Sequence, residues 1–205
     1  MMNLKDIYQR KNSHLFTFWV ACMVAVIALP NIARADVFTD PVQHFLANYE
    51  TAPGDKLLKL QVDIDGNGQE EVLLSLSKSH AYKSGNLWVV YIPVQGGFTD
   101  AKQEEADGST RDYALVGFRP DAYYIGQISE INGRGIAAYI PGGEGKGFLQ
   151  AIILRGDTIH ETDLGELDPA GTRYQALFAS SPSVSIQEIV IPLAFQSRTG
   201  SAAAP

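Results

Sequence analysis

From about residue 56 onward, the sequence is a succession of short apolar runs separated by turn-forming residues. These runs are rich in Val, Ile, Leu and aromatic residues and often alternate with polar residues, a pattern typical of β-strands. Glycines and prolines between the runs break any longer periodic segment. The strands expected from this pattern cover residues 58–62, 72–77, 87–94, 113–118, 123–131, 136–140, 148–154, 158–162 and 185–195. The pattern predicts an all-β fold that is mainly antiparallel.

One short helix precedes these strands, at residues 40–50. Asp40 is suited to the N-cap position, and Pro41 to the first helical position, where its missing N–H costs no hydrogen bond. Apolar residues then recur at helical spacing. We therefore expect one short N-terminal helix.

The sequence also predicts the structure of three further segments. Gly96 and Gly97 predict a tight hairpin. Residues 101–112 are polar and show no apolar period, so we expect an exposed loop. Residues 174–179 are consistent with a helical turn.

Residues 1–35 have the three parts of an export signal. A basic N-terminal region is followed by an uncharged apolar run at residues 15–29, and Pro30 ends this run. Ala33 and Ala35 then form a small-x-small site, which predicts cleavage before Asp36. The run is shorter than the roughly 20 apolar residues of a membrane-spanning helix. An uncleaved N-terminal anchor, or a lipoprotein signal at Cys22, is the alternative.

Cleavage at this site would leave 170 residues with 12 basic and 22 acidic side chains, a net charge of −10, and no cysteine. We expect a bacterial protein that is periplasmic or secreted, and that folds without disulfides. Residues 36–196 would form a single β-rich domain, and residues 197–205 a disordered tail. No membrane span is expected after cleavage. The acidic balance argues against nucleic-acid binding, because phosphate neutralisation needs clustered Lys and Arg.

A weak internal repeat relates residues 63–68 (DIDGNG) to residues 130–135 (EINGRG), 67 positions later. In each copy an alternating strand precedes the loop and an apolar strand follows it. A later strand in each copy begins near a glycine, Gly85 or Gly147. The similarity indicates either a duplication or a coincidence between two glycine-rich hairpins.

The first of these loops carries the pattern of a calcium site. Calcium prefers six to eight oxygen ligands, and a tight loop with oxygen side chains at alternate positions supplies them. The monodentate side-chain ligands would come from positions 1, 3 and 5, a backbone carbonyl from position 7, and a carboxylate from position 9. These candidate metal ligands are Asp63, Asp65, Asn67, Gln69 and Glu71. The alternative is a polar hairpin turn that solvates its carboxylates.

The loop differs from an EF-hand, which requires a glutamate at position 12, where this chain has Leu74. It resembles instead the calcium loops of FG-GAP or VCBS-type repeats, the β-hairpin units of integrin-like propellers and bacterial surface proteins. The resemblance implies four-stranded antiparallel units, with one intact copy and one degenerate copy. In the second copy Arg134 and Ala138 replace oxygen-bearing positions, so it should hold no ion.

Two such units, at about residues 57–118 and 119–196, are too few to close a propeller. We therefore expect two packed or propeller-blade-like sheet units, with a weakly bound, structural Ca²⁺ in the first.

Four aromatic residues of the strands suggest either an exposed platform for a sugar or peptide, or core packing. They are Trp88, Tyr91, Tyr123 and Tyr124. Their place in alternating strands favours the core.

Together these features predict an exported, non-enzymatic binding or interaction protein with a structural calcium site. Its partner would be a protein or glycan, and the acidic charge points to a basic patch on it, which loops such as residues 101–112 and 142–147 would contact. An antagonist of a cationic, lysozyme-like hydrolase is one example. The alternatives are a small secreted hydrolase that uses a carboxylate pair, and a structural component of an envelope assembly.

Overall fold

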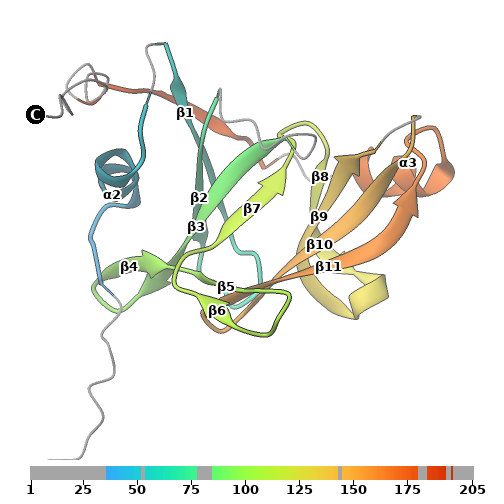
Figure 1. The fold of residues 1–205 in the computed structure, drawn as a ribbon, viewed down its shortest axis with the longest axis horizontal. Coiled ribbons are helices and arrows are strands. Elements are labelled where there is room, and N and C mark those ends of the chain that lie inside the picture. Colours follow the sequence, from blue (N-terminus) through green and yellow to red (C-terminus); the bar gives the residue numbers. More distant parts are fainter. Residues whose placement is uncertain are drawn as a thin grey trace, which may run out of the picture. The chain divides into compact units, whose positions relative to one another are not determined.

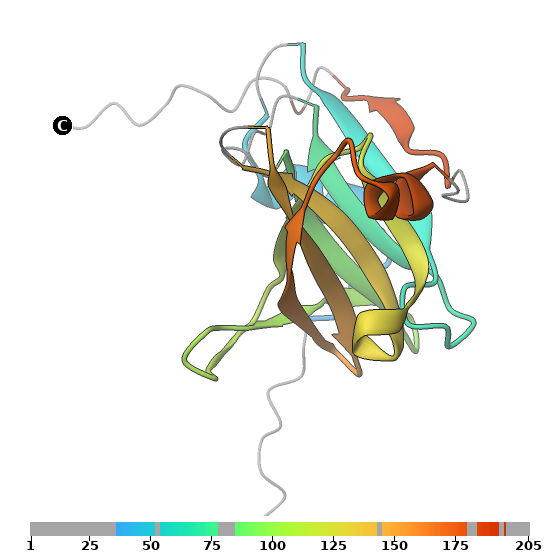
Figure 2. The same ribbon diagram turned by 90° about the vertical axis from the view of Figure 1, so that its right-hand side faces the viewer.

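In the computed structural model, two six-stranded β-sheets pack against each other through their inner faces (Figures 1 and 2). The structure describes residues 36–51, 54–77, 85–142, 145–179, 184–192 and 195. The expected export signal at residues 1–35 and the expected tail at residues 197–205 lie outside the described residues. The prediction of a mainly antiparallel all-β fold with a short N-terminal helix is confirmed.

The first sheet has the strand order β12-β1-β2-β3-β4, and β7 also pairs with β3. Every pair in it is antiparallel. Its strands are β1 (Lys56–Val62), β2 (Glu71–Leu76), β3 (Asn86–Val94), β4 (Gly97–Asp100), β7 (Leu115–Phe118) and β12 (Gln187–Val190).

The second sheet has the order β6-β5-β11-β10-β9-β8. The pairing of β5 with β11 is parallel, whereas the other pairs are antiparallel. Its strands are β5 (Lys102–Glu104), β6 (Thr110–Arg111), β8 (Tyr123–Ile128), β9 (Gly133–Pro141), β10 (Gly147–Arg155) and β11 (Thr158–Leu167).

Each sheet contains a four-stranded meander, β1 to β4 in the first and β8 to β11 in the second. Of the four remaining strands, β7 stays in the first sheet, whereas β5, β6 and β12 cross the division at residues 118 and 119 that the sequence suggested. β5 and β6 join the second sheet, and β12, far along the chain, pairs with β1 in the first. The two sheets are therefore linked by exchanged strands as well as by side-chain packing.

The expectation that residues 101–112 form an exposed loop is wrong in part, because β5 and β6 lie there. Gln103 is only 6% exposed. Its side chain donates to Glu161 Oε2 at 3.1 Å and accepts from the Leu115 N–H at 3.0 Å. Because Gln103 is polar and is buried through hydrogen bonds to residues far away in the sequence, this segment lacks the apolar pattern from which a strand could be predicted.

The N-terminal helix, α2 (Pro41–Asn48), begins where the sequence predicts. Asp40 Oδ1 accepts the Val42 N–H at 2.9 Å, which satisfies one of the free donors at a helix start. Phe45 and Leu46 pack on the outer face of the first sheet. The helical turn expected near residue 174 is α3 (Thr172–Phe178), whose side chains pack on the outer face of the second sheet. Among the described residues, no helix is both long enough and apolar enough to cross a membrane.

The apolar side chains form one cluster between the sheets and one on the outer face of each. Trp88 lies fully buried between the sheets, stacks on Phe118 at 4.8 Å between ring centroids, and donates its indole N–H to the Phe118 carbonyl at 3.1 Å. Tyr91 is fully buried as well, and Tyr123 and Tyr124 are half-buried. These aromatic residues therefore belong to the core rather than to an exposed platform.

The packing between the sheets makes a measurable prediction. Leu60 is 0% exposed at the centre of this cluster, whereas Val190 on the edge strand β12 is 79% exposed. Leu60→Ala should lower the free energy of unfolding by about 2–5 kcal/mol, because it removes buried methyl groups and leaves a cavity. Val190→Ala should change it by less than about 0.5 kcal/mol. Urea unfolding measures both, and equal losses would contradict the described packing.

Candidate metal centre

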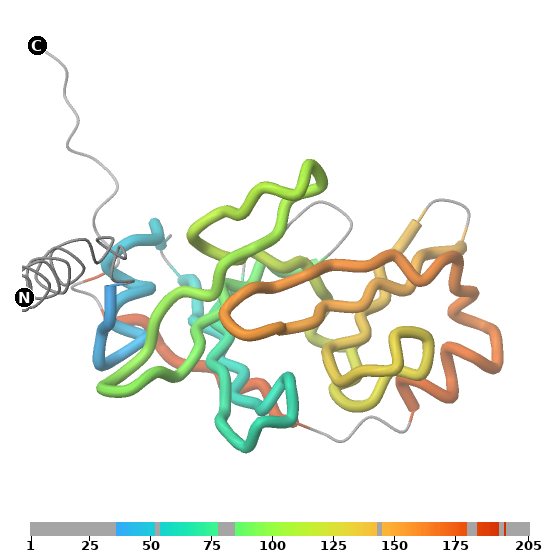
Figure 3. The backbone as a smooth tube through the Cα atoms, turned by 90° about the horizontal axis from the view of Figure 1, so that it is seen from below, coloured from blue at the N-terminus to red at the C-terminus, as the bar shows by residue number. Residues whose placement is uncertain are grey.

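The loop at residues 63–71 connects β1 to β2, the first two strands of the first meander. Figure 3 shows it as a teal turn that projects from the first sheet. The two strands stay in register up to the pair Val62 and Glu71. The loop is therefore anchored at both ends by antiparallel pairing.

Asp63 organises the backbone of this loop. Its Oδ1 atom accepts the N–H groups of Gly66 at 2.7 Å and Asn67 at 3.1 Å. Its Oδ2 atom accepts the N–H of Gly68 at 3.0 Å. Gly66 and Gly68 have φ angles of +84° and +85°, which glycine adopts without steric cost. The aspartate and the two glycines together close the turn.

Asp65 and Asn67 are joined by two hydrogen bonds. Asp65 Oδ1 accepts the Asn67 N–H at 3.0 Å, and Asp65 Oδ2 accepts the Asn67 side-chain amide at 3.1 Å. The oxygen of the Asn67 side chain accepts the N–H of Gln69 at 2.7 Å. Asn67 and Gln69 thus lie in the loop as the sequence suggests. The described contact of Gln69 is made by its N–H, whereas the prediction assigned its carbonyl to the ion.

Glu71 joins the loop to the core. It is only 1% exposed, and its Oε2 atom accepts the backbone N–H of Ile64 at 2.6 Å. Ile64 is fully buried between the sheets, whereas its neighbours Asp63 and Asp65 are only partly buried. The carboxylate of Glu71, at the start of β2, is therefore buried against the loop backbone rather than exposed to solvent.

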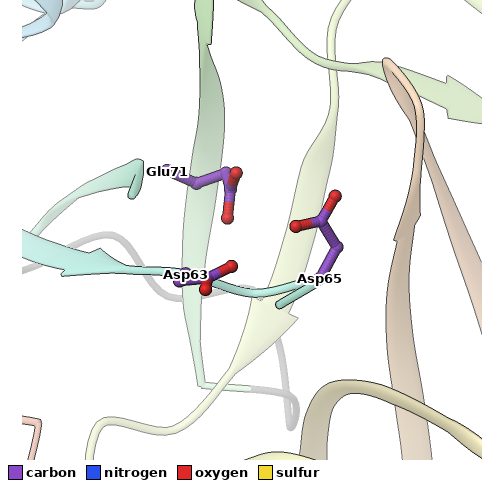
Figure 4. Close-up of side chains that lie close together, drawn as sticks. All are labelled: Asp63, Asp65 and Glu71. Carbon is purple, nitrogen blue, oxygen red and sulfur yellow. The ribbon is translucent and has the colours of Figure 1, made fainter. Parts of the chain in front are cut away.

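The carboxylates of Asp63, Asp65 and Glu71 turn toward one another (Figure 4). One oxygen from each lies within 4.8 Å of the others. Within the part of the chain that the structure describes, no second group of three or more His, Cys, Asp or Glu side chains converges in this way. The structure thus brings together the three predicted ligands that carry a negative charge.

The pKa values of Glu71 and Asp63 are shifted in opposite directions because their surroundings differ. Burial raises the pKa of Glu71 to about 7; the Ile64 N–H opposes this rise, and the charges of Asp65 and Asp63 add to it. Asp63 also feels partial burial, but the N–H groups of Gly68 and Gly66 and the charge of Arg134 outweigh it. The pKa of Asp63 is therefore lowered. A dication would favour the ionised form of all three acids.

Arg134 is the residue near this site that the sequence did not predict. Its guanidinium donates from Nε and Nη2 to the carbonyl oxygen of Asp63, at 3.2 and 3.1 Å. The sequence identified Arg134 as a departure in the second copy of the repeat. It gave no signal that the side chain reaches the first copy.

Comparisons with protein-family models, with curated proteins and with solved structures give no match to this chain. The site is therefore assigned from its own residues.

The raised pKa of Glu71 makes a prediction about pH. An ionised Glu71 is less favourable in the folded chain than in the unfolded chain. Its contribution to stability is complete below pH 4.5 and is lost as the pH rises through about 7. Glu71→Gln removes this loss. In EDTA, the free energy of unfolding of the variant relative to the native chain should rise by about 2–3 kcal/mol between pH 4.5 and 8.

Urea unfolding at several pH values measures this difference. Glu70→Gln is the matched control, because Glu70 is the exposed neighbour of Glu71 in the loop. It should show no comparable rise. A flat profile for Glu71→Gln would mean that the buried carboxyl does not titrate near neutral pH.

Proposed function

We propose that this chain is an exported, non-enzymatic binding or interaction protein, periplasmic or secreted, with one structural Ca²⁺ site at residues 63–71. The observation that carries the metal site is the convergence of three carboxylates in a closed loop between two paired strands. Oxygen ligands of this kind suit a hard dication such as calcium. An ion here would act on a hairpin and not on a substrate.

The donor set fits calcium better than a transition metal. All candidate ligands carry oxygen, and neither a thiol nor an imidazole belongs to the group. Asp63, Asp65 and Glu71 would hold the ion, with Asn67 and Gln69 as further oxygen donors. Only three of these side chains are charged, so we expect weak binding, with a Kd of about 10⁻⁴–10⁻³ M. Binding should weaken in acid, where Glu71 is protonated.

The resemblance to FG-GAP or VCBS-type repeats is part of this proposal. Two structural features support it: each sheet contains a four-stranded antiparallel meander, and the loop that resembles a calcium loop joins the first two strands of its meander. The equivalent connection in the second meander is a single 3-10 turn, η1 (Ser129–Ile131), followed by Asn132 with φ of +46°. We propose no ion there.

A hydrolase is the second candidate, and one observation favours it. Glu71 has a raised pKa and lies close to Asp63, whose pKa is lowered, a difference that acid–base catalysis requires. However, Glu71 is buried and binds the Ile64 N–H, so a substrate has no access to it in this structure. The burial favours a structural ion.

The calcium proposal is tested by thermal melts with added calcium and with EDTA. With calcium at tenfold above Kd, linkage adds about 1.4 kcal/mol. For a chain of this size that should raise the Tm by about 3–6 °C. Asp65→Ala should abolish the shift.

Asp107→Ala is the matched control. Asp107 Oδ1 accepts the Ser109 N–H at 2.9 Å in another exposed polar turn, so this variant also removes one carboxylate that stabilises a turn. It should keep the calcium shift. If the native chain shows no shift, residues 63–71 are a polar turn and the metal proposal is wrong.

The acidic charge supports a basic partner, because complementary charges accelerate and orient association. Residues 36–205, immobilised and exposed to a bacterial periplasmic extract, should retain proteins of high isoelectric point. These should be released at about 0.5 M salt, where exposed charges are screened. An unrelated acidic protein of similar net charge is the control. Retention of nothing, or of the same proteins as the control, would contradict the proposed partner.

A further inference from the structure

Arg134 connects the second sheet to the candidate metal centre in the first. It lies at the start of β9, and both of its donated hydrogen bonds end on one atom, the carbonyl oxygen of Asp63. Its aliphatic stem crosses the loop at Gly66, where an added Cβ would lie 2.9 Å from Arg134 Cδ. Gly66 therefore provides both the turn geometry and the room for the arginine.

Arg134 occupies a position in the repeat that corresponds to a candidate calcium ligand. In the alignment of residues 63–68 with 130–135, Arg134 stands where the first copy has Asn67. The second copy thus carries a cation at the place of a candidate oxygen ligand. That cation lies on the loop of the first copy.

We propose that the positive charge of Arg134 substitutes for a metal ion at the loop of residues 63–71. The arginine stabilises the metal-free loop and lowers the affinity of the loop for calcium. This inference rests on the proposed calcium site. It adds that the affinity is set from the other sheet, by a residue that is not a ligand.

The physical reason is that three carboxylates within 4.8 Å of one another repel, and a positive charge beside them reduces that repulsion. Arg134 supplies such a charge permanently, because guanidinium does not lose its proton in proteins. The same charge repels an incoming dication. Removing it should therefore have opposite effects on the two states: the metal-free loop becomes less stable, and the calcium-bound loop forms more readily.

The loop itself should survive the loss of Arg134. The two oxygens of Asp63 accept N–H groups from within the loop, and Glu71 holds the Ile64 N–H. None of these bonds involves the arginine. A variant at position 134 is therefore expected to keep the ligand geometry and to change mainly the electrostatic potential there.

The experiment is calcium titration calorimetry on the full chain and on three variants, at about 0.05 M and about 1 M NaCl. Arg134→Gln removes the charge and keeps an amide that can donate. Arg134→Lys keeps the positive charge but loses the planar guanidinium, whose Nε and Nη2 atoms both donate to the Asp63 carbonyl. Lys146→Gln removes one charge beyond the other end of β9 and is the matched control.

Arg134→Gln should lower the calcium Kd about three- to tenfold at low salt, and most of this gain should disappear at high salt, where charges beyond about 3 Å are screened. Arg134→Lys and Lys146→Gln should stay within about twofold of the native chain. In EDTA, Arg134→Gln should melt about 2–4 °C below the native chain.

A Kd that is unchanged or weaker in Arg134→Gln, while the native chain binds calcium, would overturn the role of Arg134 and leave the calcium site standing. A gain in affinity that is equal at both salt concentrations would also overturn it, because the effect would then not be electrostatic. Absence of calcium binding in the native chain and in every variant would overturn both proposals. Binding by Arg134→Gln alone would support the role of Arg134 and overturn the proposal that the native loop holds calcium.

Discussion

The bond from the Ile64 N–H to the Glu71 carboxylate is the interaction on which the candidate site depends. Ile64 is held between the two sheets, so the backbone at this point of the loop is fixed by the core. Glu71 meets it from the first position of β2 and is buried as a result. Burial of a carboxylate is unfavourable unless it is hydrogen-bonded or neutralised. The fold thus places an acid under the loop, and Asp63 and Asp65 lie against it.

The sheet arrangement explains why this loop can be influenced from elsewhere in the chain. β12 pairs with β1, and β5 pairs with β11, so neither meander is a separate unit of hydrogen bonding. The inner faces of the two sheets pack together, and the start of β9 lies next to the turn between β1 and β2, where the Arg134 side chain reaches the loop. Two hairpins that are 67 positions apart in sequence form one charged surface. An isolated hairpin with the same loop sequence would lack the arginine.

The sequence predicts those parts of the fold that follow from local patterns. Alternation identified β1, apolar runs bounded by turn residues identified β2 and β3, and Asp40 with Pro41 identified the start of α2. It failed for β5 and β6, because Gln103 is buried through bonds to Glu161 and Leu115, which lie 58 and 12 residues away. The convergence of the acids was predictable from their spacing in the loop. The Arg134 contact was not, since it depends on how two hairpins pack.

The hydrogen bonds inside the loop also decide what a metal ion could add to it. Asp63 already accepts three backbone N–H groups, and the oxygen of Asn67 is bound to the Gln69 N–H. A ligand oxygen that is already satisfied gains only the difference between its present partner and the ion. With Arg134 supplying positive charge, the loop is closed before any metal binds. The proposed calcium would therefore stabilise a turn that the backbone has already formed. Removal of the calcium should make this hairpin less stable without unfolding the sheets.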